Sequence, residues 1–135
     1  MITKIDHIGI AVNNLDEAVK LYTEKLGLAV SNIEIVTEQK VRTAIIPVGE
    51  SKIELLESTD PTGVIAKFIA QRGEGIHHIA LGVSDVKETL QDLTDKGVPL
   101  VDKEPRRGVE NTKIVFLHPK GTKILIEMVE ADGGR

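Results

Sequence analysis

Two histidines and two glutamates stand at matching positions in a sequence that repeats itself. His7 is the third residue of the run IDHIGIAV, and His78 is the third residue of the run IHHIALGV. Glu54 is the second residue of IELLE, and Glu127 is the second residue of IEMVE. Along the sequence, the separation between the two histidines is nearly the same as the separation between the two glutamates. Scattered polar residues would not be expected to show this agreement. We therefore interpret the four residues as one functional set.

The four side chains offer nitrogen and oxygen ligands to a metal. Two imidazoles and two carboxylates form a donor set suited to Zn²⁺, Co²⁺, Ni²⁺, Mn²⁺ or Fe²⁺, with positions left for water or substrate. The chain contains no cysteine, so disulfides, thiolate ligands and cysteine nucleophiles are excluded. The set therefore favours a catalytic ion over a thiolate-rich structural zinc site. An alternative for the two glutamates is an outward orientation to water on edge strands.

The two runs that carry the histidines alternate as β-strands do, with successive side chains on opposite faces. His7 and His78 each share a face with glycine and alanine, whereas the opposite face carries branched apolar residues. We expect the branched face to pack under a helix and the small-residue face to leave room for a ligand. Asp6 and His77 lie on the opposite face and are interpreted as structural.

Each histidine-bearing strand is followed by a predicted helix and then by further strands. Asn14 and Asp85 are the expected helix N-caps, and Gly27 and Gly97 follow where the helical patterns end. The further strands are expected at 29–36, 42–48 and 51–57 in the first copy and at 98–103, 112–117 and 123–129 in the second. This order predicts an α+β fold in which two paired βαβββ modules form a curved, partly open barrel-like sheet around a metal cleft.

The length fits a single domain over residues 1–135. Module one is expected at about 3–57, a connector at 58–75 and module two at about 76–130. Within the connector, Asp60 and the proline after it are expected to be the N-cap and the first-turn proline of a short helix.

The composition narrows the class of protein. The formal net charge of −4 at pH 7 argues against nucleic acid as the main partner. No apolar run approaches the roughly 20 residues that span a bilayer, and the first residues, MITKIDH, lack a signal-peptide core. We therefore expect a cytoplasmic protein with no membrane partner.

The pattern DHIGIAV…KIELLE…HHIAL…LIEMVE resembles the vicinal oxygen chelate (glyoxalase/bleomycin resistance) superfamily over about residues 3–130. Within that superfamily, the runs GEGIHHIALGV, DKEPRRG and FLHPKG are similar to the methylmalonyl-CoA epimerase family. The resemblance implies one glyoxalase-fold domain and an isomerase acting on an acyl-CoA. The implied reaction interconverts (2R)- and (2S)-methylmalonyl-CoA by proton abstraction alpha to the thioester, through a metal-stabilised enediolate.

The same resemblance implies the roles of individual residues. His7, Glu54, His78 and Glu127 correspond to the ligands of one divalent metal ion, with Co, Zn, Ni or Mn as candidates. Glu127 is also the implied catalytic base, able to leave the metal and take the proton. The implied partner is an acyl-CoA substrate, and relatives of this kind are commonly homodimers.

One position departs from the family pattern. The resemblance places Thr43 where some epimerases carry a glutamate that serves as a second base. A threonine hydroxyl is not a base near pH 7 unless it is strongly activated. Glu34, Glu38 or a water molecule are the alternatives that stay open for this role.

Basic residues gather between positions 103 and 120 of an otherwise acidic chain. We expect part of this segment to meet the phosphates of coenzyme A, with a solvated loop as the alternative. These residues are Lys103, Arg106, Arg107, Lys113 and Lys120. His118 lies in the run HPKG and is expected to be a turn residue.

Other functions on the same scaffold stay open. A glyoxalase I-type lactoylglutathione lyase or an extradiol dioxygenase would use a similar metal site, although nothing in the sequence indicates a glutathione pocket. A non-enzymatic ligand-sequestering protein would use the scaffold without metal ligands. The presence of all four candidate ligands favours an enzyme.

Overall fold

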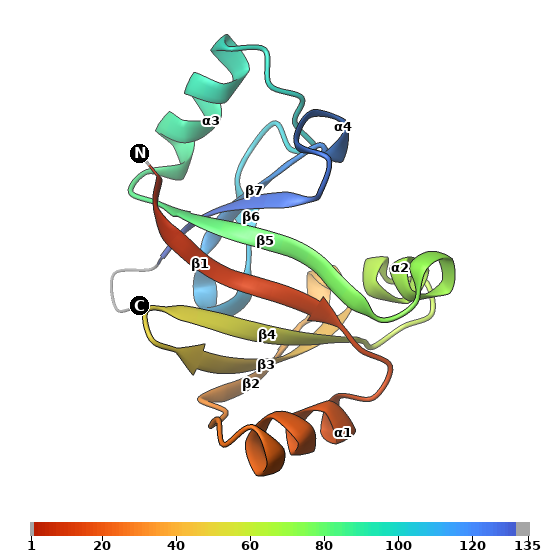
Figure 1. Ribbon diagram of the computed structural model, residues 1–135. Helices are drawn as coiled ribbons and strands as arrows, with labels where there is room; N and C mark the ends of the chain where they lie inside the picture. The colour runs from red at the N-terminus through yellow and green to blue at the C-terminus, as the bar shows by residue number, and fades with distance from the viewer. Residues whose placement is uncertain (1, 132–135) are drawn as a thin grey trace. The chain divides into compact units, whose positions relative to one another are not determined.

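The computed structural model describes residues 2–131 of the chain. These residues group into two compact units, one formed by residues 7–77 and the other by residues 2–6 together with residues 78–131. The strand β1 (Ile2–Ala11) therefore contributes to both units (Figure 1). Each unit contains one of the paired histidines and one of the paired glutamates.

The unit of residues 7–77 is built on four strands in the order β2-β3-β4-β1. The strands β2, β3 and β4 are antiparallel neighbours, whereas β1 runs parallel to β4. The elements are α1 (Leu15–Lys20), its π-helical continuation η1 (Leu21–Lys25), β2 (Asn32–Val36), the 3₁₀ turn η2 (Thr37–Gln39), β3 (Val41–Val48), β4 (Ser51–Ser58) and α2 (Val64–Arg72).

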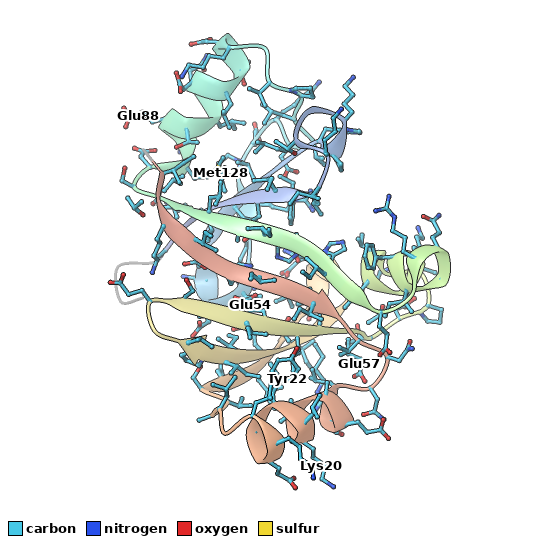
Figure 2. All side chains as sticks on the ribbon, viewed as in Figure 1. Lys20, Tyr22, Glu54, Glu57, Glu88 and Met128 are labelled. Carbon is cyan, nitrogen blue, oxygen red and sulfur yellow. The ribbon has the colours of Figure 1, made fainter. Side chains whose placement is uncertain are left out.

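The helix α1 covers the apolar face of this unit's sheet. Asn14 caps it, since the side-chain Oδ1 accepts a hydrogen bond from the backbone N–H of Glu17 at 3.0 Å. Tyr22 of η1 packs against the apolar cluster beneath the helix (Figure 2). The buried members of that cluster are Val12, Leu15, Ala44, Ile46 and Leu55. The expected N-cap is thus confirmed, and the branched face of β1 does pack under a helix.

The unit that contains residues 78–131 repeats this plan with the strand order β5-β8-β7-β6. The strand β5 runs parallel to β8, and the other neighbours are antiparallel. The elements are β5 (Gly75–Val83), α3 (Val86–Asp95), β6 (Arg106–Arg107), the 3₁₀ turn η3 (Val109–Asn111), β7 (Lys113–Leu117), α4 (Pro119–Thr122) and β8 (Ile126–Glu130).

The helix α3 plays the same part here as α1 does in the other unit. Asp85 caps it, since the side-chain Oδ1 accepts a hydrogen bond from the backbone N–H of Glu88 at 3.0 Å. The buried cluster under α3 comprises Val83, Val86, Leu90, Val115, Leu117 and Met128. The α+β class and the two βαβββ modules are therefore confirmed. The enclosure of a metal cleft by the paired modules stays a prediction.

The prediction of a strand at 98–103 is wrong. Only Leu100 makes an isolated bridge, to Leu117, and the ordered strand β6 comes later, at Arg106–Arg107. The pairing with β7 stops because the Asp102 carboxylate replaces a backbone carbonyl. Its Oδ2 accepts a hydrogen bond from the backbone N–H of Phe116 at 2.8 Å.

Three smaller boundaries also differ from expectation. The connector helix α2 begins after Gly63, because Asp60 instead accepts hydrogen bonds from the backbone N–H and the hydroxyl of Thr62. The strand β2 begins only at residue 32, and β8 begins at residue 126, after the short helix α4. His118 caps α4 through its Nδ1, which agrees with the expected turn role.

No helix within residues 2–131 is long and apolar enough to cross a membrane. The single-domain organisation with its module and connector boundaries stays a prediction.

Candidate metal centre and active site

The first half-site pairs His7 of β1 with Glu54 of β4. The parallel register places Glu54 opposite Gly9, so the glutamate and the histidine share the small-residue face. The His7 Nδ1 and Glu54 Oε2 atoms are 3.3 Å apart. The two residues are 3 % and 1 % exposed. Glu54, which is labelled in Figure 2, therefore lies inside the unit and not on a solvated edge.

The second half-site pairs His78 of β5 with Glu127 of β8 in the same way. Ala80 is the register partner of Glu127, which again puts a small residue opposite the carboxylate. The His78 Nε2 and Glu127 Oε1 atoms are 3.5 Å apart. The residues are 6 % and 5 % exposed. The alternative in which both glutamates point to water is therefore wrong.

Each half-site is chemically suited to a divalent metal. Burying a carboxylate is costly unless a cation or hydrogen bonds compensate for the lost water. Each unit nevertheless buries one carboxylate next to one imidazole nitrogen, and these are ligand types for zinc, cobalt, nickel and manganese. The residues present therefore fit such an ion, while their assignment as ligands stays a prediction.

A second glutamate in each repeat has a structural role that the sequence did not reveal. Glu57 Oε2 accepts a hydrogen bond from the backbone N–H of Leu15 at 2.9 Å. Glu130 Oε1 accepts one from the backbone N–H of Val86 at 2.8 Å. In both repeats, the first glutamate therefore lies on the ligand face. The second glutamate, three residues later, holds a helix N-terminus on the other face.

Thr43 lies on the same face of the sheet as the first half-site. It is the cross-strand partner of Leu56, which shares its face of β4 with Glu54. Thr43 is completely buried, and its hydroxyl has no hydrogen-bond partner among the described residues. On the other side, Thr43 is paired with Glu34 of β2. Thr43, which departs from the family pattern, therefore lies on the face of the sheet that carries His7 and Glu54.

An aromatic ring and an arginine border the second half-site. Phe116 meets the His78 ring edge to face, with the ring centroids 6.0 Å apart. The Arg106 guanidinium carbon lies 5.1 Å from the centroid of the Phe116 ring. Asp102 fixes this arginine, because its Oδ1 accepts hydrogen bonds from Nη2 at 2.6 Å and from Nε at 3.0 Å.

A cavity of about 1220 Å³ lies beside Arg106, between α3 and the segment that leads into β6 and β7. Among its acidic residues, Asp102 and Glu130 are already engaged, by Arg106 and by the start of α3 respectively. Its basic residues are Lys87, Lys103, Arg106, Arg107 and Lys113. Four of the five expected phosphate-binding residues therefore line one cavity, and Lys120 does not.

The other two residues singled out beside the histidines are Asp6, which is buried, and His77, which is partly buried. His77 packs edge to face on Phe68, with centroids 5.0 Å apart, and burial lowers the pKa of its imidazole to about 4. Burial therefore favours the neutral form of the His77 imidazole. Asp6 is 2 % exposed.

Comparison with known proteins gives a family and several close relatives. The model of the glyoxalase/bleomycin resistance protein/dioxygenase superfamily matches residues 6–116. The uncharacterized protein YqjC of Bacillus subtilis is 40 % identical over 96 % of this chain and 94 % of its own length. The mitochondrial methylmalonyl-CoA epimerase of Dictyostelium discoideum is 34 % identical over 96 % of this chain and 79 % of its own length.

Solved structures agree with the sequence comparison. A methylmalonyl-CoA epimerase in complex with methylmalonyl-CoA and NH₄⁺ superimposes with a TM-score of 0.95 and is 41 % identical. The match covers 98 % of this chain and 97 % of that one. The resemblance inferred from the repeated motifs is therefore confirmed.

Proposed function

Because the chain belongs to the glyoxalase/bleomycin resistance protein/dioxygenase superfamily, we propose that it interconverts (2R)- and (2S)-methylmalonyl-CoA. The observation that carries the proposal is the duplicated half-site, with a buried histidine nitrogen 3.3 or 3.5 Å from a buried glutamate oxygen. The similarity to methylmalonyl-CoA epimerases over nearly the whole chain supports the choice of substrate.

We propose that His7, Glu54, His78 and Glu127 together hold one divalent metal ion, with Co, Zn, Ni or Mn as candidates. The matched nitrogen and oxygen donors of the two half-sites support this assignment, which requires both half-sites to meet at one ion. When bound, such an ion polarises the oxygen atoms of a thioester and a carboxylate.

The proton transfer is assigned to the protein's own carboxylates. The hydrogen on C2 of the substrate is acidified by the thioester and the carboxylate on either side of it. Glu127 is the proposed base that removes this hydrogen as a proton on one face. Glu127 is the cross-strand partner of Phe116 and is 5 % exposed, so little of the residue is in contact with bulk water. Exclusion of water strengthens the electrostatic interactions on which such a step depends.

The coenzyme A portion of the substrate is assigned to the basic cavity. Phosphate groups are recognised best by arginine and lysine, and the cavity offers both. Arg106 connects the cavity to the half-site, since it contacts Phe116, which in turn contacts His78. This arrangement supports an acyl-CoA whose nucleotide lies in the cavity and whose acyl end reaches His78.

The assembly and the location complete the proposal. We propose a homodimer, because epimerases of the kind that this sequence resembles are commonly dimers. Light scattering would then give twice the chain mass of 14.7 kDa. A cytoplasmic location agrees with a chain that contains no cysteine.

The test is isotope exchange in D₂O with the metal-loaded protein. Each epimer of methylmalonyl-CoA is incubated separately, and deuterium at C2 and the ratio of epimers are followed by mass spectrometry and NMR. Deuterium at C2 together with loss of configuration supports the proposal. The absence of exchange with each of Co, Zn, Ni and Mn would reject it, and lactoylglutathione formation would point to the glyoxalase alternative.

A further inference from the structure

The strand β6 places two neighbouring arginines on opposite faces of the sheet. Successive side chains of a strand point to opposite sides, and cross-strand partners share a side. Arg106 is paired with Ile114 and therefore lies on the face that carries Phe116. Arg107 is paired with Lys113 and lies on the other face, which α3 covers. The two arginines therefore divide basic charge between the ligand face and the helix face.

A hydrogen bond on the helix face agrees with this division. Lys113 is paired on its other side with Glu130 of β8. The Glu130 carboxylate accepts its hydrogen bond from the backbone N–H of Val86, at the start of α3. Arg107 and Lys113 therefore lie on the side of the sheet that faces α3, away from Phe116.

The cavity of about 1220 Å³ lies at this edge of the sheet, and both arginines line it. Leu90 and Leu100 also line the cavity, and both belong to or pack against the apolar cluster under α3. Within residues 2–131, β6 is the last strand of the sheet. The cavity therefore combines an apolar wall with basic side chains from both faces of a sheet edge.

Coenzyme A carries anionic groups at two places that match this arrangement. A diphosphate joins the nucleoside to the pantetheine arm, and a separate phosphate is attached to the 3′ oxygen of the ribose. The acyl group is at the far end of the pantetheine arm, so the diphosphate precedes the 3′-phosphate along the molecule when it is followed from the acyl end. An acyl end near His78 therefore brings the diphosphate toward Arg106 first. The adenine ring suits the apolar wall.

We propose that Arg107 and Lys113 bind the 3′-phosphate of the coenzyme A portion on the helix face, while Arg106 binds the diphosphate on the ligand face. This inference rests on the proposed epimerase function. A phosphate monoester carries close to two negative charges near pH 7, and two basic side chains match that charge. Arg107 and Lys113 are then the residues that distinguish coenzyme A from dephospho-coenzyme A, which lacks only the 3′-phosphate.

The test compares methylmalonyl-CoA with methylmalonyl-dephospho-CoA as substrates of the metal-loaded protein. For the unsubstituted protein we expect the KM of the dephospho compound to be higher by about 10-fold or more, the effect of losing hydrogen bonds to a charged group. The double variant Arg107→Ala/Lys113→Ala should have the same KM for both compounds. Arg106→Ala should raise both KM values by a similar factor, so that their ratio stays as in the unsubstituted protein.

A charge-matched control separates a local contact from the general loss of positive charge. The double variant Lys96→Ala/Lys120→Ala removes two basic residues of the same unit that lie outside the cavity, and it should keep the KM ratio. Arg107 and Lys113 are both exposed, so their replacement should leave the circular dichroism spectrum unchanged. High salt should reduce the KM ratio of the unsubstituted protein, because contacts between exposed charges are screened.

Two results would overturn the inference and leave the epimerase function intact. One is an unsubstituted protein that epimerises both compounds with equal KM values. The other is a KM ratio that persists in Arg107→Ala/Lys113→Ala. An unsubstituted protein that epimerises neither compound would instead reject the proposed function, and this inference with it.

Discussion

Glu57 and Leu15 are joined by a hydrogen bond in which the carboxylate at the end of β4 accepts from the first backbone N–H of α1, at 2.9 Å. Glu130 and Val86 repeat this contact at the start of α3, at 2.8 Å. The first turns of a helix have unsatisfied N–H groups and a partial positive charge, which an anionic acceptor stabilises. The same strand that carries a candidate ligand therefore also fixes the neighbouring helix.

Glu57→Ala should lower the free energy of unfolding by about 1–2 kcal/mol, the range for losing a charge-assisted hydrogen bond at a helix end. Glu57→Gln keeps an acceptor and should lose less. Urea unfolding followed by circular dichroism measures both. Glu24→Ala, which removes an exposed carboxylate of η1, is the control and should change stability by less than about 0.5 kcal/mol. Equal losses for Glu57→Ala and Glu24→Ala would contradict the capping role.

Replacement of either paired histidine should abolish metal retention. His7→Ala and His78→Ala each remove one nitrogen donor from a buried site, so both should lose the ion on dialysis. The metal-to-protein ratio, measured by atomic emission, reports this independently of activity. His118→Ala is the matched control, because His118 caps α4 and is not in either half-site. If His78→Ala retains as much metal as His118→Ala, the ligand assignment is wrong.

The sequence was sufficient to find the histidines and glutamates because strand alternation and repeat spacing are local properties of the chain. The sequence left an outward orientation of Glu54 and Glu127 open, and only the structure shows that both are buried. The contacts of Arg106 with Phe116 and Asp102 were not predicted, because the strand was expected at 98–103 and the ladder with β7 instead forms at Arg106–Arg107. The contact of Glu57 with Leu15 joins residues far apart in sequence, and no local pattern specifies it. The mechanistic gap at Thr43 was visible in the sequence, which left Glu34, Glu38 and a water molecule open for the role. The register of β2 and β3 adds that Glu34 is the residue directly across from Thr43.

Arg106→Ala should weaken binding of coenzyme A by about 10-fold, which corresponds to about 1.4 kcal/mol. The arginine is held in place by Asp102 before any ligand binds, so little conformational freedom is lost on binding. Isothermal titration calorimetry with coenzyme A measures the effect. Lys120→Ala removes a basic residue outside the cavity and should leave the affinity unchanged. Equal affinities of the two variants would show that the cavity is not the coenzyme A site.

Gly108→Ala should destabilise the segment that carries Arg106. An added Cβ would lie 2.7 Å from Thr112 Oγ1 and 2.8 Å from Ile114 Cγ2, which is closer than real contacts allow. Thr112 and Ile114 are each 2 % exposed, so neither can easily move away. We expect a loss of about 1–3 kcal/mol in unfolding free energy, typical of overpacking. We also expect weaker coenzyme A binding, since Gly108 directly follows β6.

A double-mutant cycle with Ile114→Val tests the steric cause of this loss. The valine lacks one terminal carbon but keeps the branched Cγ2, so it relieves only part of the crowding at Gly108. A third variant, Ile114→Ala, removes the Cγ2 atom and so removes the clash of the added methyl group with residue 114. The loss caused by Gly108→Ala should therefore be smaller on the Ile114→Ala background than on the unsubstituted chain, and the remaining loss should come from the contact with Thr112 Oγ1 at 2.7 Å. The free energies of unfolding are measured in urea. If the losses caused by Gly108→Ala and Ile114→Ala are strictly additive, the contact with Ile114 does not cause the destabilisation.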